Sequence, residues 1–444
     1  MGISNSNFAT INATHLNPAK TTDPQNNFEL QMLGLNFFAK NNYAFVPKEV
    51  FKITNPTNIS IADDFKESGV YNGHLEFDLI GPSFTKALYE YGFGISTRFR
   101  GYVNVHNLPS HVAKFLQEGF AYDEQHDEPY AAGDFMIKSM SWGEVNFNFS
   151  RIAYQFNQHL LTAGLTLKRL IGYHNAGFYF KDVNYEVVDN DVDVFLLNGT
   201  YALTTPTAFG AGRGWGFDLG FEYKKTIKPV NNYKPFSTKS SCEKRKYDYR
   251  IGLSILDIGG IKFNTNARYR EITDANGTWA NYQNTNLTSW GGIDGEIISR
   301  FDPDEVQLSD EYRASLPTSV AIEIDKRFRD IFFFNATGLY GFRLRENQGV
   351  ARLGFFSVTP RVELPKYEAA MPITLYNFKS PAVGLMLRYS GFYLGTNNFL
   401  PYFFNVNVWG ADFYLGFKYT IPTNKECKPA IRDINNWWCP SCND

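Results

Sequence analysis

The C-terminal residues gather the side chains best suited to redox or metal chemistry. Three of the four cysteines, Cys427, Cys439 and Cys442, lie in "NKECKPAIRDINNWWCPSCND", and the fourth is Cys242. A C-x-x-C pair becomes a redox centre when the surrounding fold lowers the pKa of one thiol, and this short tail cannot build such a fold. In an oxidising compartment we expect a small disulfide. A third thiol then remains for a metal or for a cysteine of a partner.

Two tryptophans, Trp437 and Trp438, stand beside these cysteines. Exposed aromatic side chains of this size are unfavourable in water and often anchor protein interfaces. The residues predicted to bind a partner are therefore Trp437, Trp438, Cys427, Cys439 and Cys442.

Catalytic motifs are absent from the rest of the sequence. The seven histidines are scattered without an HExxH spacing, and neither GxSxG nor a P-loop occurs. The acidic run "YDEQHDEP" (122–129) is either a solvated loop or a calcium site, and we expect the solvated loop. It contains Asp123, Glu124, Asp127 and Glu128. The sequence therefore predicts a protein that is not an enzyme and holds no cofactor or metal.

Charged residues recur at every second position of several segments, as expected when β-strands position them. In "GWGFDLGFEYKKTI" (214–227), odd positions are aromatic or aliphatic and even positions are glycine or charged. Neighbouring side chains of a strand point to opposite faces. The segment therefore has one apolar face and one polar face.

The same alternation returns in 92–100, 160–169, 246–259 and 410–421. A soluble sandwich would bury the apolar face against a second sheet, whereas a transmembrane barrel turns it to lipid and lines its lumen with the polar set. On the barrel interpretation, the predicted lumen-facing charges are Arg98, Arg100, Asp218, Glu222, Asp248, Arg250, Asp412 and Lys418.

Composition and strand number favour the barrel. The 444 residues include 40 Phe, 27 Tyr and 36 Gly, and the net charge of -2 gives no sign of nucleic-acid binding. Several alternating segments have the 9–11 residues, roughly, that a tilted strand needs to cross a bilayer. The sequence predicts an all-β, antiparallel, closed outer-membrane barrel of about fourteen strands (12–16) in a single chain, with short loop helices.

Connection lengths support this prediction in the first half of the chain. Short links follow Ile80, Ile152 and Tyr201, and long loops occupy about 41–71, 104–138, 169–191 and 228–245. Residues 260–315 break the rule, which indicates a missed strand near 261–269 or a segment folded into the lumen. Short helices are predicted at 109–119 and 301–306. The N-terminus has no signal-peptide pattern, which fits either a cytosolic chain or a mature exported one.

At this point the sequence resembles a known group. "HLNPAK", "YRIGLSILDIGGIKF", "SLPTSVAIEID" and "GADFYLGFKYTIP" are similar to outer-membrane barrels of Bacteroidota related to the PorP/SprF type. That resemblance implies an outer-membrane location and service to secretion or gliding machinery. Asn17, Pro18 and Ala19 also resemble the N-terminal segment that FadL-like barrels use as a hatch in the lumen. An ordinary turn at Pro18 is the alternative, and we favour the turn.

These observations divide the chain into an N-terminal periplasmic or lumen segment (1–26), the barrel (27–421) and a periplasmic Cys/Trp tail (422–444). The expected function is that of a component or scaffold of a cell-envelope complex. Its partners would be outer-membrane lipid and other envelope proteins, reached through the tail and loops. The alternative is a FadL-like or porin-like channel for a small or hydrophobic solute.

Overall fold

The computed structural model describes residues 2–48, 62–64, 66, 69–118, 126–189, 191–207, 210–236, 246–281, 290–301, 306–342, 348–400 and 407–421. The tail with Trp437, Trp438, Cys427, Cys439 and Cys442 lies outside these ranges, as do Cys242, residues 122–125 of the acidic run and residues 302–305. The predictions made for those residues remain predictions.

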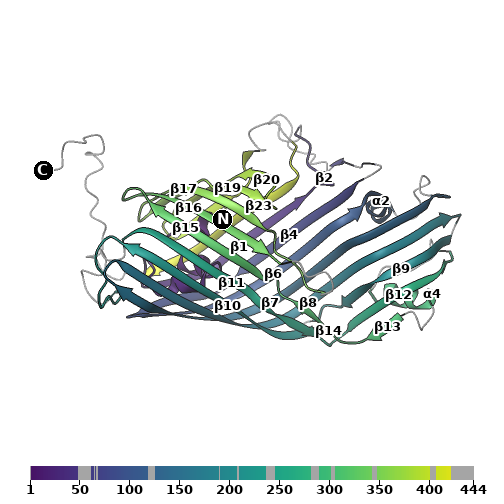
Figure 1. Cartoon of the computed structure of the whole chain (residues 1–444), viewed down its shortest axis with the longest axis horizontal. Coiled ribbons are helices and arrows are strands. Elements are labelled where there is room, and N and C mark those ends of the chain that lie inside the picture. The colour runs from purple at the N-terminus through teal and green to yellow at the C-terminus, as the bar shows by residue number, and fades with distance from the viewer. Residues whose placement is uncertain are drawn as a thin grey trace.

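One antiparallel sheet closes on itself to form the barrel in Figure 1, because the first strand pairs with the last. Several strands are interrupted by bends, and joining their segments gives fourteen barrel strands, which confirms the predicted fold class. In chain order they are β1 (Phe28–Asn41); β4 (Val70–Ile80) with β5 (Ser83–Leu88); β6 (Tyr91–Pro109); β7 (Pro129–Phe156); β8 (His159–Val188); β9 (Asp191–Thr204) with β10 (Gly212–Thr226); β11 (Tyr247–Phe263) with β12 (Ala267–Trp279); β13 (Val306–Ser309), β14 (Tyr312–Ser315) and β15 (Ser319–Arg327); β16 (Phe332–Gly341); β17 (Phe355–Glu363); β18 (Tyr367–Ala370) with β19 (Ile373–Tyr376); β20 (Ser380–Val383) with β21 (Leu385–Tyr389); β22 (Phe392–Thr396); and β23 (Gly410–Ile421).

The remaining elements are short. β2 (Ala44–Phe45) and β3 (Ala62–Asp63) pair with each other, and the described helices are η1 (Gly2–Asn5), α1 (Thr10–Thr14), η2 (Pro18–Thr21), α2 (Ser110–Glu118) and α4 (Trp290–Arg300). None of the described helices has the length and apolarity needed to cross a membrane. α2 lies where the sequence predicts a helix, and α4 was not predicted.

The two faces of the sheet have inverted polarity compared with a soluble protein. Along β10, Phe217, Leu219 and Phe221 point outward and are exposed, whereas Asp218 and Glu222 point inward and are buried. The other strands repeat this arrangement. An apolar outer wall around a polar interior is stable only when lipid surrounds it. The protein is therefore a transmembrane barrel, and barrels of this kind reside in the bacterial outer membrane.

Loop lengths orient the barrel in the membrane. At the end where β1 begins, connections are mostly short, at 89–90, 157–158, 328–331, 364–366 and 390–391. The opposite end carries longer ones, at 42–69, 110–128, 280–305 and 397–409. Short periplasmic turns and long extracellular loops are typical of these proteins. The first end is therefore periplasmic, and 227–246 is its one long connection between barrel strands.

Some strands extend far beyond the membrane on the extracellular side. β7 has 28 residues and β8 has 30, about three times the length that crosses a bilayer. Figure 1 shows their extracellular halves running with β9 and β12 towards the right of the view, next to α2 and α4. Ile297 of α4 packs on a buried cluster that includes Tyr201, Leu203 and Ile272. This cluster stabilises the part of the sheet beyond the membrane, here called the projection.

The projection corrects the predicted connections. The expected short link after Tyr201 is not a turn between barrel strands, because β9 and β10 follow one another as two parts of one long descending strand. Residues 260–315 contain the extracellular half of the next ascending strand and the first part of its return, and 328–331 is a periplasmic turn. Above the membrane both faces of the sheet can be covered by protein. The alternation that marks a membrane strand therefore ends there, although the strand continues.

Replacing an outward leucine at mid-strand with arginine should weaken the barrel. Leu219 is 38% exposed and Leu253 is 50% exposed, and both face lipid. We expect Leu219→Arg or Leu253→Arg to lower the free energy of unfolding by about 2–4 kcal/mol, measured by urea titration in lipid vesicles. Leu88→Arg, at a periplasmic hairpin, should cost about 0–1 kcal/mol. Equal costs at all three positions would contradict the assigned facing.

Candidate functional site

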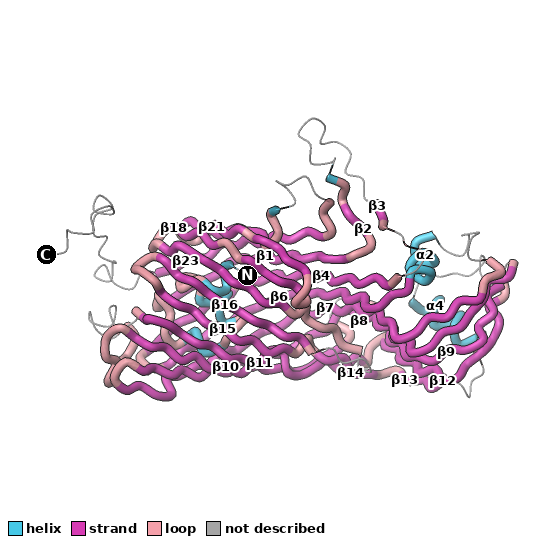
Figure 2. The backbone as a smooth tube through the Cα atoms, turned by 45° about the horizontal axis from the view of Figure 1, so that its top comes forward, coloured by secondary structure: helices cyan, strands magenta, loops and turns pink. Residues whose placement is uncertain are grey.

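The N-terminal residues 2–24, here called the plug, lie inside the barrel. Most of their side chains are buried by the surrounding strands, and Figure 2 shows their short helices within the ring of strands. The backbone N–H groups of Thr10 and Ile11 donate to the Glu29 carboxylate of β1, which caps the start of α1. The plug is thereby fixed to the strand that follows it in sequence.

The predicted hatch residues lie against glycines of the barrel wall. Asn17 accepts a hydrogen bond from the Ala19 N–H at 3.0 Å and donates to the Phe221 carbonyl at 2.9 Å. It thus forms a turn and a wall contact at once. A Cβ on Gly220 would overlap Asn17 and stand 2.7 Å from Pro18 Cδ, and one on Gly164 would lie 2.5 Å from the Ala19 nitrogen. Only glycine leaves room for the plug at these two positions.

Charged side chains near the periplasmic end form ion pairs between the plug and the barrel wall. Lys20 of the plug pairs with Glu323 at 2.6 Å, and Lys224 pairs with Asp23 of the plug at 3.1 Å. All four of these side chains are buried. Buried ion pairs of this kind are costly to break singly, so the plug is seated firmly.

Three of the predicted lumen charges belong to this lower layer. Arg250 donates to the Asn5 carbonyl of the plug at 3.1 Å, and Lys418 donates to the Phe8 carbonyl. Glu222 lies 3.2 Å from Lys224, one of the side chains that hold the plug. A fourth, Asp412, is buried elsewhere in the lumen and accepts a hydrogen bond from the Asn397 backbone N–H at 3.1 Å.

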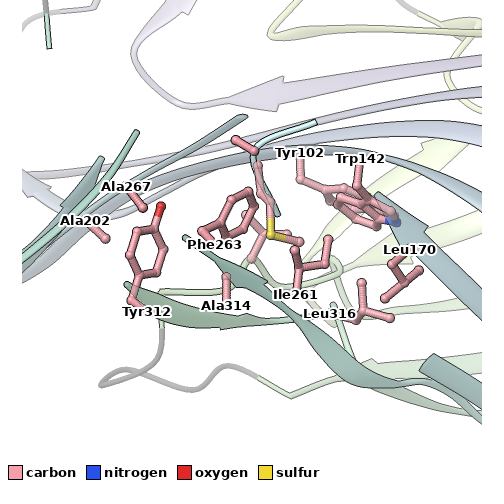
Figure 3. Close-up of a cluster of buried hydrophobic side chains, with 13 residues drawn as sticks. Tyr102, Trp142, Leu170, Ala202, Ile261, Phe263, Ala267, Tyr312, Ala314 and Leu316 are labelled. Atoms are coloured by element: carbon pink, nitrogen blue, oxygen red, sulfur yellow. The ribbon is translucent and has the colours of Figure 1, made fainter. Parts of the chain in front are cut away.

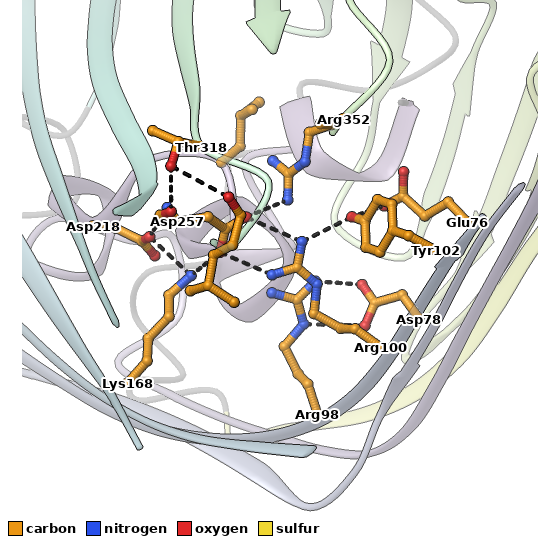
Figure 4. A network of polar contacts seen from close by, with 12 residues as sticks. Glu76, Asp78, Arg98, Arg100, Tyr102, Lys168, Asp218, Asp257, Thr318 and Arg352 are labelled. Carbon is orange, nitrogen blue, oxygen red and sulfur yellow. Dashed lines mark hydrogen bonds and ion pairs between the residues drawn. The ribbon is translucent and has the colours of Figure 1, made fainter. Parts of the chain in front are cut away.

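A second charged layer, here called the charge cluster, lies above the plug and includes Arg98, Arg100 and Asp218 (Figure 4). Its centre is Asp257, which accepts hydrogen bonds from Arg100 at 2.8 and 3.0 Å, Lys168 at 2.5 Å and Arg352 at 3.0 Å. The full cluster is Glu76, Asp78, Arg98, Arg100, Glu144, Lys168, Asp218, Asp257 and Arg352. Four cations face five carboxylates, so the layer is nearly neutral.

Sequence reasoning missed the members of the charge cluster that matter most. Asp257 has a φ of 58°, so it interrupts the regular alternation of β11 and its facing cannot be read from period two. Arg352 lies in the connection between β16 and β17, which enters the lumen from the extracellular side. Glu144 and Lys168 sit at inward positions of alternating strands, a signal that was available.

The structure corrects one predicted lumen residue. Asp248 lies outside both charged layers and pairs with Lys326 at 2.6 Å, with the two side chains 47% and 43% exposed. A bulge between Tyr247 and Tyr249 shifts the register of β11 against β10. The extra residue reverses the facing, so Tyr247 points into the lumen and Asp248 does not.

An apolar layer lies in the lumen above the charge cluster. Tyr102 and Trp142 stack with ring centroids 5.6 Å apart, and the Arg100 guanidinium lies 4.9 Å from the Trp142 ring. Phe263 and Leu316 belong to the same buried cluster, which Figure 3 shows. Packing of this kind narrows the lumen above the plug.

A cavity of about 170 Å³ remains between the plug, the charge cluster and the wall. Its lining includes the apolar side chains Leu16, Leu339 and Phe355, which belong to one buried cluster, together with polar side chains such as His15 and Arg98. Burial, and then the nearby Arg98 charge, hold the pKa of His15 well below its usual value, so its imidazole is neutral. No group of His, Cys, Asp or Glu in the described ranges is arranged to hold a metal ion.

A closed fourteen-stranded barrel with a lipid-facing wall and a lumen filled by its own N-terminal segment defines an outer-membrane β-barrel protein. The chain belongs to DUF5723, a family of unknown function, whose model matches residues 18–397. Kinship with the PorP/SprF type stays a prediction. A comparison with curated protein sequences found no match.

Several solved structures are similar over most of the chain. The toluene transporter TodX of P. putida has a TM-score of 0.46 and 10% identity, covering 93% of this chain and 95% of its own. The Ralstonia pickettii toluene transporter TbuX has a TM-score of 0.43 and 10% identity, covering 92% and 93%. A Pseudomonas aeruginosa FadL homologue has a TM-score of 0.41 and 10% identity, covering 93% and 94%.

Proposed function

We propose that the protein is a gated conduit for a small, largely apolar solute and that the plug closes it. The observation that carries this proposal is the cavity of about 170 Å³ that lies between the plug and the barrel wall. An apolar cavity of about 150 Å³ is large enough to bind benzene. A solute the size of one aromatic ring therefore fits. Such a solute would contact Leu16, Leu339 and Phe355.

The contents of the lumen support a selective conduit over an open pore. The plug, the charge cluster and the apolar layer succeed one another along the barrel axis, so ions and sugars meet tightly packed protein. A solute would pass when the plug shifts and the polar contacts of the plug exchange with water. The alternative role, as a component of an envelope complex, rests on residues 422–444 and stays a prediction.

Uptake of an apolar one-ring compound tests the proposal. Cells whose outer membrane contains the barrel should take up labelled ethylbenzene faster than cells without it. Leu353→Trp places a larger side chain against the cavity and should return uptake to the background rate. Leu364→Trp, on a periplasmic turn, is the matched control and should keep the full rate.

Two results would contradict the conduit. One is equal ethylbenzene uptake with and without the barrel. The other is equally fast uptake of a sugar, because a porin-like pore would admit it as readily.

A further inference from the structure

Four basic side chains cluster on the outer wall of the barrel, outside the lumen site. Arg169, Arg213, Lys262 and Arg313 lie on adjacent strands β8, β10, β11 and β14. Three of them border a hollow of about 400 Å³, together with Trp215, Tyr312 and Glu311. None of these residues contributes to the plug or to the charge cluster.

Strand register places like charges directly opposite one another. Arg213 is the partner of Lys262 across β10 and β11, and Lys262 is the partner of Arg313 across β11 and β14. Like charges directly opposite on one face of a sheet are destabilising. Such a row indicates that an anion offsets the repulsion in the assembled protein.

The protein itself supplies too little negative charge here. Glu311 pairs with Lys262 at 2.8 Å, and both side chains are more than half exposed. Arg213 and Arg313 form no ion pair with any residue in the described ranges. One carboxylate against four cations leaves a net charge of three positive units at this site.

The position of these four cations along the membrane normal indicates which anion binds them. Trp215 begins the lipid-facing series that continues through Phe217, Leu219 and Phe221, and it is 55% exposed. Aromatic girdles mark the boundary between the acyl chains and the head groups. Arg213 lies one outward position above Trp215, about 7 Å along the strand towards the extracellular side. The cations therefore stand at the level of the head groups of the outer leaflet.

Tryptophan and arginine are also arranged to hold a phosphate beside acyl chains. The Arg169 guanidinium lies 4.9 Å from the Trp215 ring, and its Nη1 donates to the Gly214 carbonyl at 3.2 Å. These contacts fix one guanidinium in place without neutralising it. Guanidinium groups bind phosphate oxygens in pairs of charge-assisted hydrogen bonds.

We infer that this row, Arg169, Arg213, Lys262 and Arg313, is a binding site for a phosphorylated glycolipid of the outer leaflet. The phosphate sits in the hollow against Arg213, Lys262 and Arg313. The acyl chains run down the wall past Trp215 and Phe217. The site makes the lipid a specific partner of one side of the barrel.

Native mass spectrometry of the folded barrel, extracted from nanodiscs of phosphatidylcholine containing bis-phosphorylated lipid A, tests this inference. The wild type should retain lipid A. Arg213→Gln with Arg313→Gln should weaken retention about thirtyfold, since each basic residue near such a surface contributes on the order of a factor of five. Arg151→Gln with Lys225→Gln is the matched control, because both cations are outward at the periplasmic rim.

The control double variant should retain lipid A as the wild type does, and both variants should keep the heat-modifiable gel migration of a folded barrel. Excess inorganic phosphate should not displace the lipid. Equal retention by the two double variants would overturn the inference. Displacement by inorganic phosphate would overturn it as well, since the site would then be one for free anions.

Discussion

Deleting residues 2–24 should convert a closed barrel into a conducting one. The plug fills the periplasmic part of the lumen, and its removal exposes to water the charged side chains that it now contacts. Barrels of eight strands are filled by side chains, whereas those of about sixteen leave an aqueous channel. In planar bilayers we expect the wild type to show almost no current and the deletion to show steady conductance steps.

A single substitution should shift the equilibrium between the seated plug and the displaced plug without shortening the chain. Gly220→Leu places a side chain where Asn17 and Pro18 now lie. Overpacking of this kind costs about 1–3 kcal/mol, which would favour the displaced plug by roughly 5- to 150-fold. Gly101→Leu is the control, because a Cβ there meets nothing closer than Ser141 at 3.9 Å.

Conductance of the control should equal that of the wild type, and the open fraction of Gly220→Leu should rise. If both the deletion and Gly220→Leu assemble as heat-modifiable barrels yet stay closed, the plug does not gate the lumen. The charge cluster and the apolar layer would then be the barrier.

Removing the carboxylate at the centre of the charge cluster should destabilise the barrel strongly. Asp257 accepts hydrogen bonds from Arg100, Lys168 and Arg352, and the Arg100 side chain is fully buried. Asp257→Ala leaves these three cations close together without the carboxylate that they share. Breaking a buried ion pair from one side costs about 3–5 kcal/mol, and we expect a loss of this size in the free energy of unfolding, measured by urea titration in lipid vesicles.

Asp248→Asn is the matched comparison for that experiment. Its carboxylate pairs with Lys326 on the surface, where ion pairs contribute about 0–1 kcal/mol. A loss of equal size for Asp257→Ala and Asp248→Asn would show that the cluster is not an isolated buried network. The Arg100 and Lys168 charges would then be solvated in the lumen.

The lipid-facing and lumen-facing sets could be predicted from sequence because period-two alternation is a local property of a strand. Phe217, Leu219 and Phe221 face outward and Asp218 and Glu222 face inward as the pattern predicts. The strand number of about fourteen followed from repeating the same local test along the chain. The connections were less predictable, since a bend within a strand and a turn between strands look alike in sequence.

The sequence by itself determined the class of protein: a closed outer-membrane barrel with an apolar wall and a charged lumen. Only the tertiary structure decided what fills that lumen and which charges meet. Asp257 joins Arg100 and Arg352 from positions 157 and 95 residues apart, and the plug lies against Gly164 and Gly220 of different strands. Such contacts depend on strand register, on one bulge that turns Asp248 outward and on the path of the N-terminus through the barrel. None of these is a property of a local stretch of chain.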